Sequence, residues 1–190
     1  MSDQRLTEIA EYQRGVTELQ VDLKTGAQIN INSDHSYIHQ GKYFTVTHKV
    51  DILAGATNKI TFLTGAAKEI HYRPVNIITS VDKLTFNHYE GSSGNSGGSV
   101  LTPVNRNRKL EATALTDVAV KTGVTVTTNG TLISTAYIPG STDVGGVRNG
   151  DTLSAENEWV LKPSTLYTLE FINGSAAANT VWIELHWYEE

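Results

Sequence analysis

Residues 166–188 read LYTLEFINGSAAANTVWIELHWY and hold the strongest secondary-structure signal in the chain. Apolar and polar side chains alternate in both halves of this stretch, which is the two-residue period of a β-strand with one buried face. The apolar set is Tyr167, Leu169, Phe171, Val181, Ile183, Leu185 and Trp187. Asn173 and Gly174 break the alternation with residues typical of turns. We therefore predict two strands joined as a hairpin at Asn173-Gly174.

Strand-like composition extends over most of the remaining chain. The further segments are 43–50, 59–63, 70–79, 83–89, 100–104, 118–127, 131–138 and 158–161. No segment after the N-terminal part has a convincing helical period. The sequence therefore predicts an all-β fold, a jelly roll or β-sandwich of about 9–11 strands.

Proline and glycine positions add detail to this prediction. Pro74 lies inside a strand-like segment and indicates an edge strand or a bulge, because proline cannot donate to the ladder. Asn129-Gly130 predicts a tight hairpin between the segments on either side. GSSGNSGGS, residues 91–99, has the composition of a flexible loop tip, and residues 139–151 predict a second long loop.

Composition and charge narrow the classes of function. The 190 residues include no cysteine, which excludes a disulfide scaffold, a thiolate zinc site, an iron–sulfur cluster and a cysteine nucleophile. A formal net charge of −5 with only 15 Lys and Arg is not typical of nucleic-acid binding. Apolar stretches are too short to span a membrane. We expect no cofactor, no nucleic-acid partner and no membrane partner.

The first 34 residues differ from the rest. Residues 3–19 have an amphipathic helical spacing, and the pattern then changes to extended chain. We predict an N-terminal arm over residues 1–34, used for attachment or oligomerisation, and a β body over 35–190. The alternative is a strand and helix packed on the body's own core. The residues expected to anchor the arm to a capsid or to a neighbouring subunit are Leu19, Val21, Leu23, Ile29 and Ile31.

GNSGGS, residues 94–99, resembles the nucleophile loop of chymotrypsin-like serine proteases, with Ser96 as nucleophile. His48 and Asp82 precede it in the order that such a protease requires. However, one strand-like segment separates Asp82 from Ser96, where that fold interposes most of a second barrel. A nucleophile must also be held rigidly, which a glycine-serine loop does not favour. We therefore predict that the chain is not an enzyme and has no catalytic residues.

Histidines are candidate metal ligands, and aromatic residues are candidate sugar-binding residues. His35 and His39 are four residues apart, but in an extended segment they would lie about 13 Å apart, so we predict no metal site there. A metal site built from histidines on several strands is the alternative to ordinary surface or interface histidines. The basic stretch 106–109 is expected to be a solvated loop. Trp159, Trp182 and Tyr188, with Tyr167, could stack on sugar rings, although packing in the core or an interface is commoner.

Three segments together resemble a known family. HSYIHQGKYFTVTHKVDILAGATNKITFLT (35–64), FNHYEGSSGNSGGSVLTPVNRNR (86–108) and NEWVLKPSTLYTLEFINGSAAANTVWIELHWYEE (157–190) are similar to small virion structural proteins of tailed bacteriophages. The shared features are a histidine-glycine strand, an asparagine-arginine segment after a YEG loop, and an EWVLKP ending. The resemblance covers most of residues 35–190 and leaves the arm unmatched.

The resemblance implies a β-structured capsid decoration or head-fibre protein, often a homotrimer. It implies that the chain binds the major capsid protein on the capsid surface of a virion assembled in the host cytoplasm. The alternative, from another functional class, is a tail-fibre or receptor-binding module that engages host glycans through Trp159, Trp182 or Tyr188.

Overall fold

The structure is a computed structural model that describes residues 20–21, 28–29, 33–79, 83–110, 116–138, 147–149 and 158–190. Contacts divide the chain into two units, Met1–Ser36 and Tyr37–Glu190. Within the first unit, β1 (Gln20–Val21) pairs antiparallel with β2 (Gln28–Ile29). The predicted helix over 3–19 lies outside the described residues.

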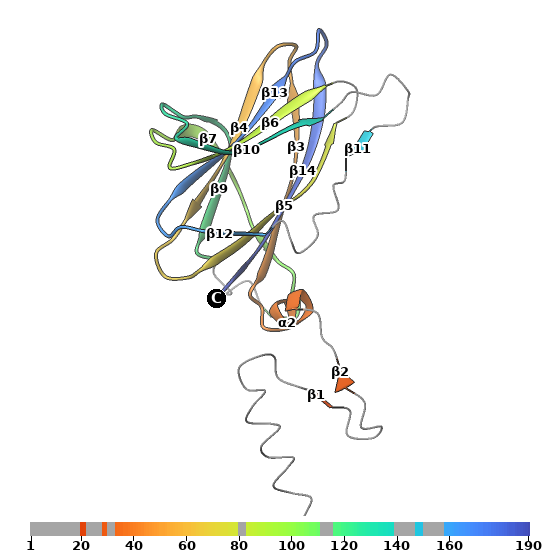
Figure 1. Cartoon of the computed structure of the whole chain (residues 1–190), viewed down its shortest axis with the longest axis vertical. Coiled ribbons are helices and arrows are strands. Elements are labelled where there is room, and N and C mark those ends of the chain that lie inside the picture. Colours follow the sequence, from red (N-terminus) through yellow and green to blue (C-terminus); the bar gives the residue numbers. More distant parts are fainter. Residues whose placement is uncertain are drawn as a thin grey trace, which may run out of the picture. The chain divides into compact units, whose positions relative to one another are not determined.

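Residues 37–190 form an antiparallel β-sandwich, which confirms the predicted all-β class (Figure 1). One layer, called here the β13 sheet, has the strand order β10-β6-β13-β4-β9-β7. Its strands are β10 (Thr131–Ile138), β6 (Leu84–Glu90), β13 (Leu166–Asn173), β4 (Thr57–Thr64), β9 (Val118–Thr125) and β7 (Ser96–Leu101).

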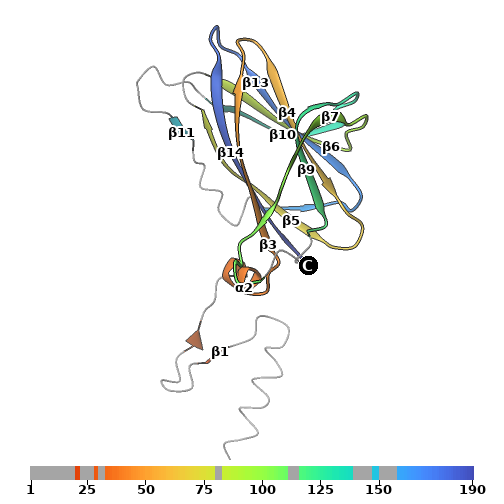
Figure 2. The same ribbon diagram turned by 180° about the vertical axis from the view of Figure 1, so that it is seen from behind.

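The other layer, called here the β14 sheet, has the order β11-β5-β14-β3-β8, and β12 also pairs with β5. Its strands are β11 (Val147–Asn149), β5 (Ile70–Thr79), β14 (Asn179–Glu189), β3 (Tyr43–Ile52), β8 (Val104–Asn105) and β12 (Trp159–Leu161). Figure 2 shows β3, β5 and β14 from the opposite side. None of the described helices is long and apolar enough to cross a membrane.

The predicted alternation on β13 and β14 is confirmed in the core. The predicted apolar set of both strands points between the sheets and is buried, together with residues such as Phe44 of β3, Phe62 of β4 and Ile70 of β5. Trp187 is the largest of them. Its ring stacks on Phe44 at 5.8 Å and meets Phe62 edge-on at 5.2 Å between centroids. Such aromatic pairs add to the free energy gained from burial alone.

The hairpin predicted at Asn173-Gly174 is wrong. β13 belongs to one sheet and β14 to the other, so the intervening turn carries the chain across the sandwich. The buried Asn173 amide Nδ2 donates to the backbone oxygens of Ile52, Leu53 and Ala177. Asn173 thereby joins this corner to the β3–β4 corner. Alternating apolar residues indicate that one face of a strand is buried. They do not indicate whether the next strand lies in the same sheet or in the other one.

The hairpin predicted at Asn129-Gly130 is also wrong, because β9 pairs with β4 and β7, whereas β10 pairs with β6. The segment runs instead against the β6–β7 connection, where Ser93 and Thr128 form an isolated bridge. Gly130 has φ +84° and packs so closely that a Cβ atom would lie 2.2 Å from the Glu90 carbonyl oxygen. Glycine at position 130 therefore allows the backbone to pack closely against Glu90.

Residues 91–99 are not a flexible loop tip. Ser96 begins β7, which pairs with β9 from Ser96↔Thr125 to Leu101↔Val120. Ser92 is buried, and its hydroxyl donates to the Asn129 backbone oxygen at 2.5 Å and accepts from Thr168 Oγ1 at 2.8 Å. Backbone pairing thus orders a segment whose side chains contribute little packing.

Two further predictions concern β5 and residues 139–151. Pro74 lies between the part of β5 paired with β12 and the part paired with β11, and a register shift follows it opposite Ile183–Glu184. Its position therefore combines a local edge with a bulge, as predicted. Within 139–151, residues 147–149 form β11 and the others lie outside the described residues.

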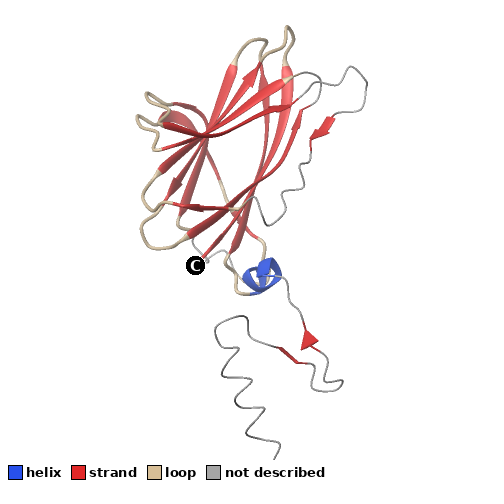
Figure 3. Ribbon diagram, in the orientation of Figure 1, coloured by secondary structure: helices blue, strands red, loops and turns tan. Residues whose placement is uncertain are grey.

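The segment around His35 and His39 is helical, not extended as predicted. α2 (Ser33–His39) is the helix drawn in blue in Figure 3. Asp34 lies in its first turn and His39 in its last, which suits the helix dipole. The predicted separation of about 13 Å between His35 and His39 is therefore wrong, because in a helix residues four apart lie on one face.

Candidate functional site

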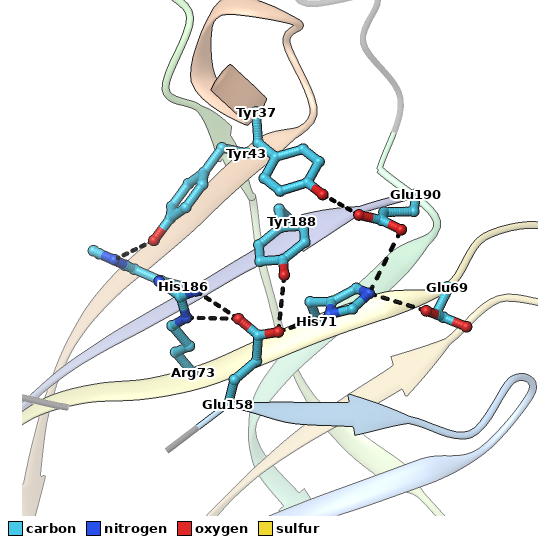
Figure 4. Close-up of polar contacts among 9 residues, drawn as sticks. All are labelled: Tyr37, Tyr43, Glu69, His71, Arg73, Glu158, His186, Tyr188 and Glu190. Atoms are coloured by element: carbon cyan, nitrogen blue, oxygen red, sulfur yellow. Dashed lines mark hydrogen bonds and ion pairs between the residues drawn. The ribbon is translucent and has the colours of Figure 1, made fainter. Parts of the chain in front are cut away.

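One end of the outer face of the β14 sheet holds a connected group of nine polar and aromatic side chains (Figure 4). We call it the Glu158 cluster, and its members are Tyr37, Tyr43, Glu69, His71, Arg73, Glu158, His186, Tyr188 and Glu190. Strand register explains their meeting. His71 on β5 lies opposite Tyr188 on β14, and Arg73 lies opposite His186. Because their neighbours Tyr72 and Trp187 face the core, these side chains face outward.

Glu158 is the centre of the cluster. Its Oε1 accepts hydrogen bonds of 2.8 Å from both His71 Nδ1 and Tyr188 OH, and its Oε2 accepts 2.9 Å and 2.5 Å bonds from Nε and Nη2 of Arg73. Burial raises the pKa of Glu158, but the bonds from His71, Arg73 and Tyr188 outweigh it and lower the pKa overall. Glu158 is therefore a carboxylate at neutral pH.

Aromatic stacking fixes the ring of His71. Tyr188 lies between Tyr37 and His71, with centroid separations of 4.1 Å and 4.4 Å and interplanar angles of 12° and 10°. Arg73 Cζ lies 5.7 Å from the Tyr188 centroid, a cation–π distance. Burial, and then the bond to Glu158, raise the pKa of Tyr188, so its hydroxyl keeps its proton as a donor.

The opposite side of His71 faces two more carboxylates. His71 Nε2 lies 3.0 Å from Glu69 Oε1 and 4.0 Å from Glu190 Oε2. The backbones of Glu69 and Glu190 exchange hydrogen bonds of 3.2 Å and 3.0 Å, so the two residues lie directly opposite each other. Tyr37 OH also donates to Glu190, and this bond raises the pKa of Tyr37 to about 12. Among the described residues, Glu69, His71 and Glu190 form the group whose side chains could hold a metal ion.

A second histidine lies inside the sandwich. His88 on β6 is buried among the rings of Tyr72, Phe86, Trp159 and Tyr167, with centroid distances of 5.7 to 6.5 Å. Burial lowers the pKa of His88 to about 4, although Glu90 acts in the opposite direction. The imidazole is therefore neutral at physiological pH.

The three aromatic residues weighed for a glycan face do not share one surface. Trp182 is 47% exposed on the outer face of β14. Trp159 lies opposite the inward-facing Tyr72 and contacts His88. Tyr188 is only 6% exposed because Tyr37 and His71 cover its ring. Trp182 is thus the most exposed of the three, and Trp159 is 36% exposed although its ring contacts His88.

The other predicted residues are spread over the chain. Val21 is in β1 and Ile29 in β2, whereas Leu19, Leu23 and Ile31 lie outside the described residues. For the protease alternative, His48 is on β3 of one sheet and Ser96 on β7 of the other, and Asp82 lies outside the described residues.

Sequence reasoning missed the Glu158 cluster. Its signal was the set of ionisable and aromatic residues at outward positions of two strands, His71 and Arg73 on one, His186 and Tyr188 on the other. The sequence does not show that these two strands pair. It also does not show that Glu158, 87 residues after His71, lies beside them. No protein-family model matches the chain, and no curated protein matches its sequence.

Proposed function

We propose that the chain is a structural protein of a tailed-phage virion, a decoration protein that binds the head exterior as a homotrimer. Its activity is binding to the major capsid protein, not turnover. The sequence resemblance over residues 35–190 to small virion proteins motivates this proposal. The observation that supports it best is the division of the contacts into residues 1–36 and a β-sandwich over 37–190 with its own buried core.

This organisation suits a module that is fixed to a lattice by an arm. An extended arm can add strands to a neighbour's sheet and gain main-chain hydrogen bonds. Threefold symmetry then multiplies weak contacts through avidity. β1 and β2 show that this part of the chain can adopt strand structure.

The test of attachment compares two double variants in the same strands. Val21→Asp with Ile29→Asp removes two predicted anchors, and Gln20→Asp with Gln28→Asp adds the same charge at the neighbouring positions. Undecorated heads of the phage are mixed with each full-length protein and pelleted. We expect the first variant to lose head binding and the second to retain most of it. Equal binding by both variants would reject these anchors.

Mass measurement tests the trimer. Light scattering of the purified chain should give about three times 20.7 kDa. A monomer at all concentrations would reject the homotrimer in solution.

The receptor-binding alternative has one outward aromatic residue in its favour. Trp182 is exposed, and Lys49 Nζ lies 6.0 Å from its ring centroid. Glycan-array binding that Trp182→Ala abolishes would favour that alternative over decoration.

A further inference from the structure

We propose that Glu69, His71 and Glu190 form a binding site for a divalent transition-metal ion of the zinc type. The ion would join the start of β5 to the end of β14. The inference does not depend on the proposed function.

The orientation of His71 is the first argument. Because Glu158 is an anion and can only accept, Nδ1 of His71 must donate in the 2.8 Å bond between them. In the neutral imidazole, Nε2 then carries a lone pair, and it points at Glu69 Oε1 at 3.0 Å. A lone pair facing a carboxylate oxygen is repulsive unless a cation lies between them. A metal ion bound by His71 Nε2 and Glu69 Oε1 meets this requirement.

The local charge is the second argument. Glu69 and Glu190 lie directly opposite each other, where two like charges destabilise a sheet. Within the cluster, the carboxylates of Glu69, Glu158 and Glu190 and the guanidinium of Arg73 sum to two negative charges before the two histidines, His71 and His186, are counted. A divalent ion between the carboxylates of Glu69 and Glu190 would balance both charges.

The geometry is the third argument. Tetrahedral ligands at zinc distances of about 2.0–2.1 Å lie roughly 3.4 Å from one another. The potential ligand atoms of Glu69, His71 and Glu190 all lie within 4.8 Å of one another, so small side-chain rotations bring them to that spacing. The side chains of Glu69 and Glu190 are 58% and 43% exposed, which leaves room for rotation and for a water molecule as fourth ligand.

A built outer shell distinguishes this site from a chance group of surface acids. A carboxylate that accepts from the non-ligating nitrogen is the usual support of a metal-bound histidine. Here Glu158 has that position, Arg73 and Tyr188 hold Glu158, and Tyr188 stacks on the His71 ring. Glu158 would therefore be a positioning residue and not a ligand.

The ligand chemistry favours zinc or a similar ion. One imidazole nitrogen and two carboxylate oxygens suit Zn²⁺, Co²⁺ and Mn²⁺, whereas Mg²⁺ and Ca²⁺ prefer oxygen ligands alone. Three protein ligands leave at least one coordination position open. That position would take water or an acidic side chain of a neighbouring molecule.

Calorimetric titration of the untagged full-length chain with zinc chloride at neutral pH tests the site. Glu69→Gln changes an exposed ligand and should not affect folding. We expect one zinc ion per chain for the wild type and at least tenfold weaker binding for Glu69→Gln. The matched control is Glu184→Gln. Glu184 and His186, both on β14, form another Glu–His pair at 2.7 Å, and neither belongs to the proposed ligand set. Glu184→Gln should bind zinc as the wild type does.

Cobalt absorption and Glu158→Gln test the outer shell. Co²⁺ should give visible bands that Glu69→Gln abolishes and Mg²⁺ does not displace. Glu158→Gln should weaken zinc binding by about 10–100-fold while the cobalt bands keep their positions at saturation. The proposal is wrong if the wild type does not bind zinc up to millimolar concentration, or if Glu69→Gln and Glu184→Gln bind it equally.

Discussion

Asn173 donates a 3.0 Å hydrogen bond from its side-chain amide to the backbone oxygen of Ile52, a residue 121 positions earlier in the chain. The same amide reaches Leu53 and Ala177, so one buried side chain joins two of the connections between the sheets. Its Oδ1 also accepts from the Ser175 backbone nitrogen. The Asn173 side chain thus links the β3–β4 and β13–β14 connections at one end of the sandwich.

Asn173→Ala should destabilise the sandwich by about 2 kcal/mol or more, because it removes the donor to the buried Ile52 carbonyl and to two partly buried carbonyls. Urea unfolding followed by tryptophan fluorescence measures the change. Ser175→Ala is the control, since its hydroxyl bond to Ala177 is exposed, and it should cost less than about 1 kcal/mol. Equal effects of the two substitutions would contradict the role of Asn173.

Gly130→Ala separates backbone strain from a steric clash. Gly130 and Gly123 both have positive φ, +84° and +66°, but only at Gly130 would a Cβ atom meet backbone, at 2.2 Å from the Glu90 oxygen. Gly123→Ala should therefore cost roughly 1–2 kcal/mol for the left-handed conformation alone. Gly130→Ala should cost roughly 1–3 kcal/mol more. Thermal unfolding of both variants tests this, and the reverse order would contradict the close approach.

What the sequence predicts well is local. The alternation of Val181, Ile183, Leu185 and Trp187 follows from the two-residue period of a strand, and all four side chains are buried. The partner of each strand is a long-range property. Asn129-Gly130 favours a hairpin in isolation, yet the bridge between Ser93 and Thr128 directs the chain elsewhere. Tertiary contacts decide between two connections that have the same local pattern.

The candidate site illustrates the same limit. His71 and Glu158 attract no notice in the sequence, because neither belongs to a motif with fixed spacing. They meet because β12 pairs with β5, which places Val160 opposite His71 and brings Glu158 alongside. Tyr188 is a possible glycan-stacking residue by sequence, with packing as the commoner role, and in the structure Tyr37 of α2 covers its ring. The pairing of the strands and the position of α2 together determine which side chains meet, and neither is visible in the sequence.

Protonation of Glu158 should lower the free energy of unfolding at acid pH. Its folded-state pKa is lowered, so its contribution is present above the ordinary glutamate pKa and is lost as pH falls below it. The difference in unfolding free energy between the wild type and Glu158→Gln should be largest at pH 7 and shrink below about pH 4.3. Chemical denaturation at pH 7, 5 and 3 measures it. Glu170→Gln should behave in the same way, since hydrogen bonds from Asn87 and Lys59 overcome burial and lower the pKa of Glu170. A difference that grows towards pH 3 would contradict this assignment.

His88 should act in a separate pH range. Burial lowers its folded-state pKa to about 4, so the unfolded chain takes up the proton first and stability falls as pH decreases from about 6.5 towards 4. The loss should reach roughly 3 kcal/mol, and His88→Phe should remove most of it. The control is His48→Gln, because burial also lowers the pKa of His48 but that side chain is only half-buried. An unchanged pH dependence in His88→Phe would show that another group is responsible.

Cryo-electron microscopy of purified virions tests the central claim most directly. The virion should come from the phage whose genome encodes this chain. We expect the sandwich of residues 37–190 to fit threefold-symmetric density on the outer surface of the head, with the N-terminal segment against the major capsid protein. Density for the sandwich on the tail, or its absence from the particle, would contradict the proposed decoration function.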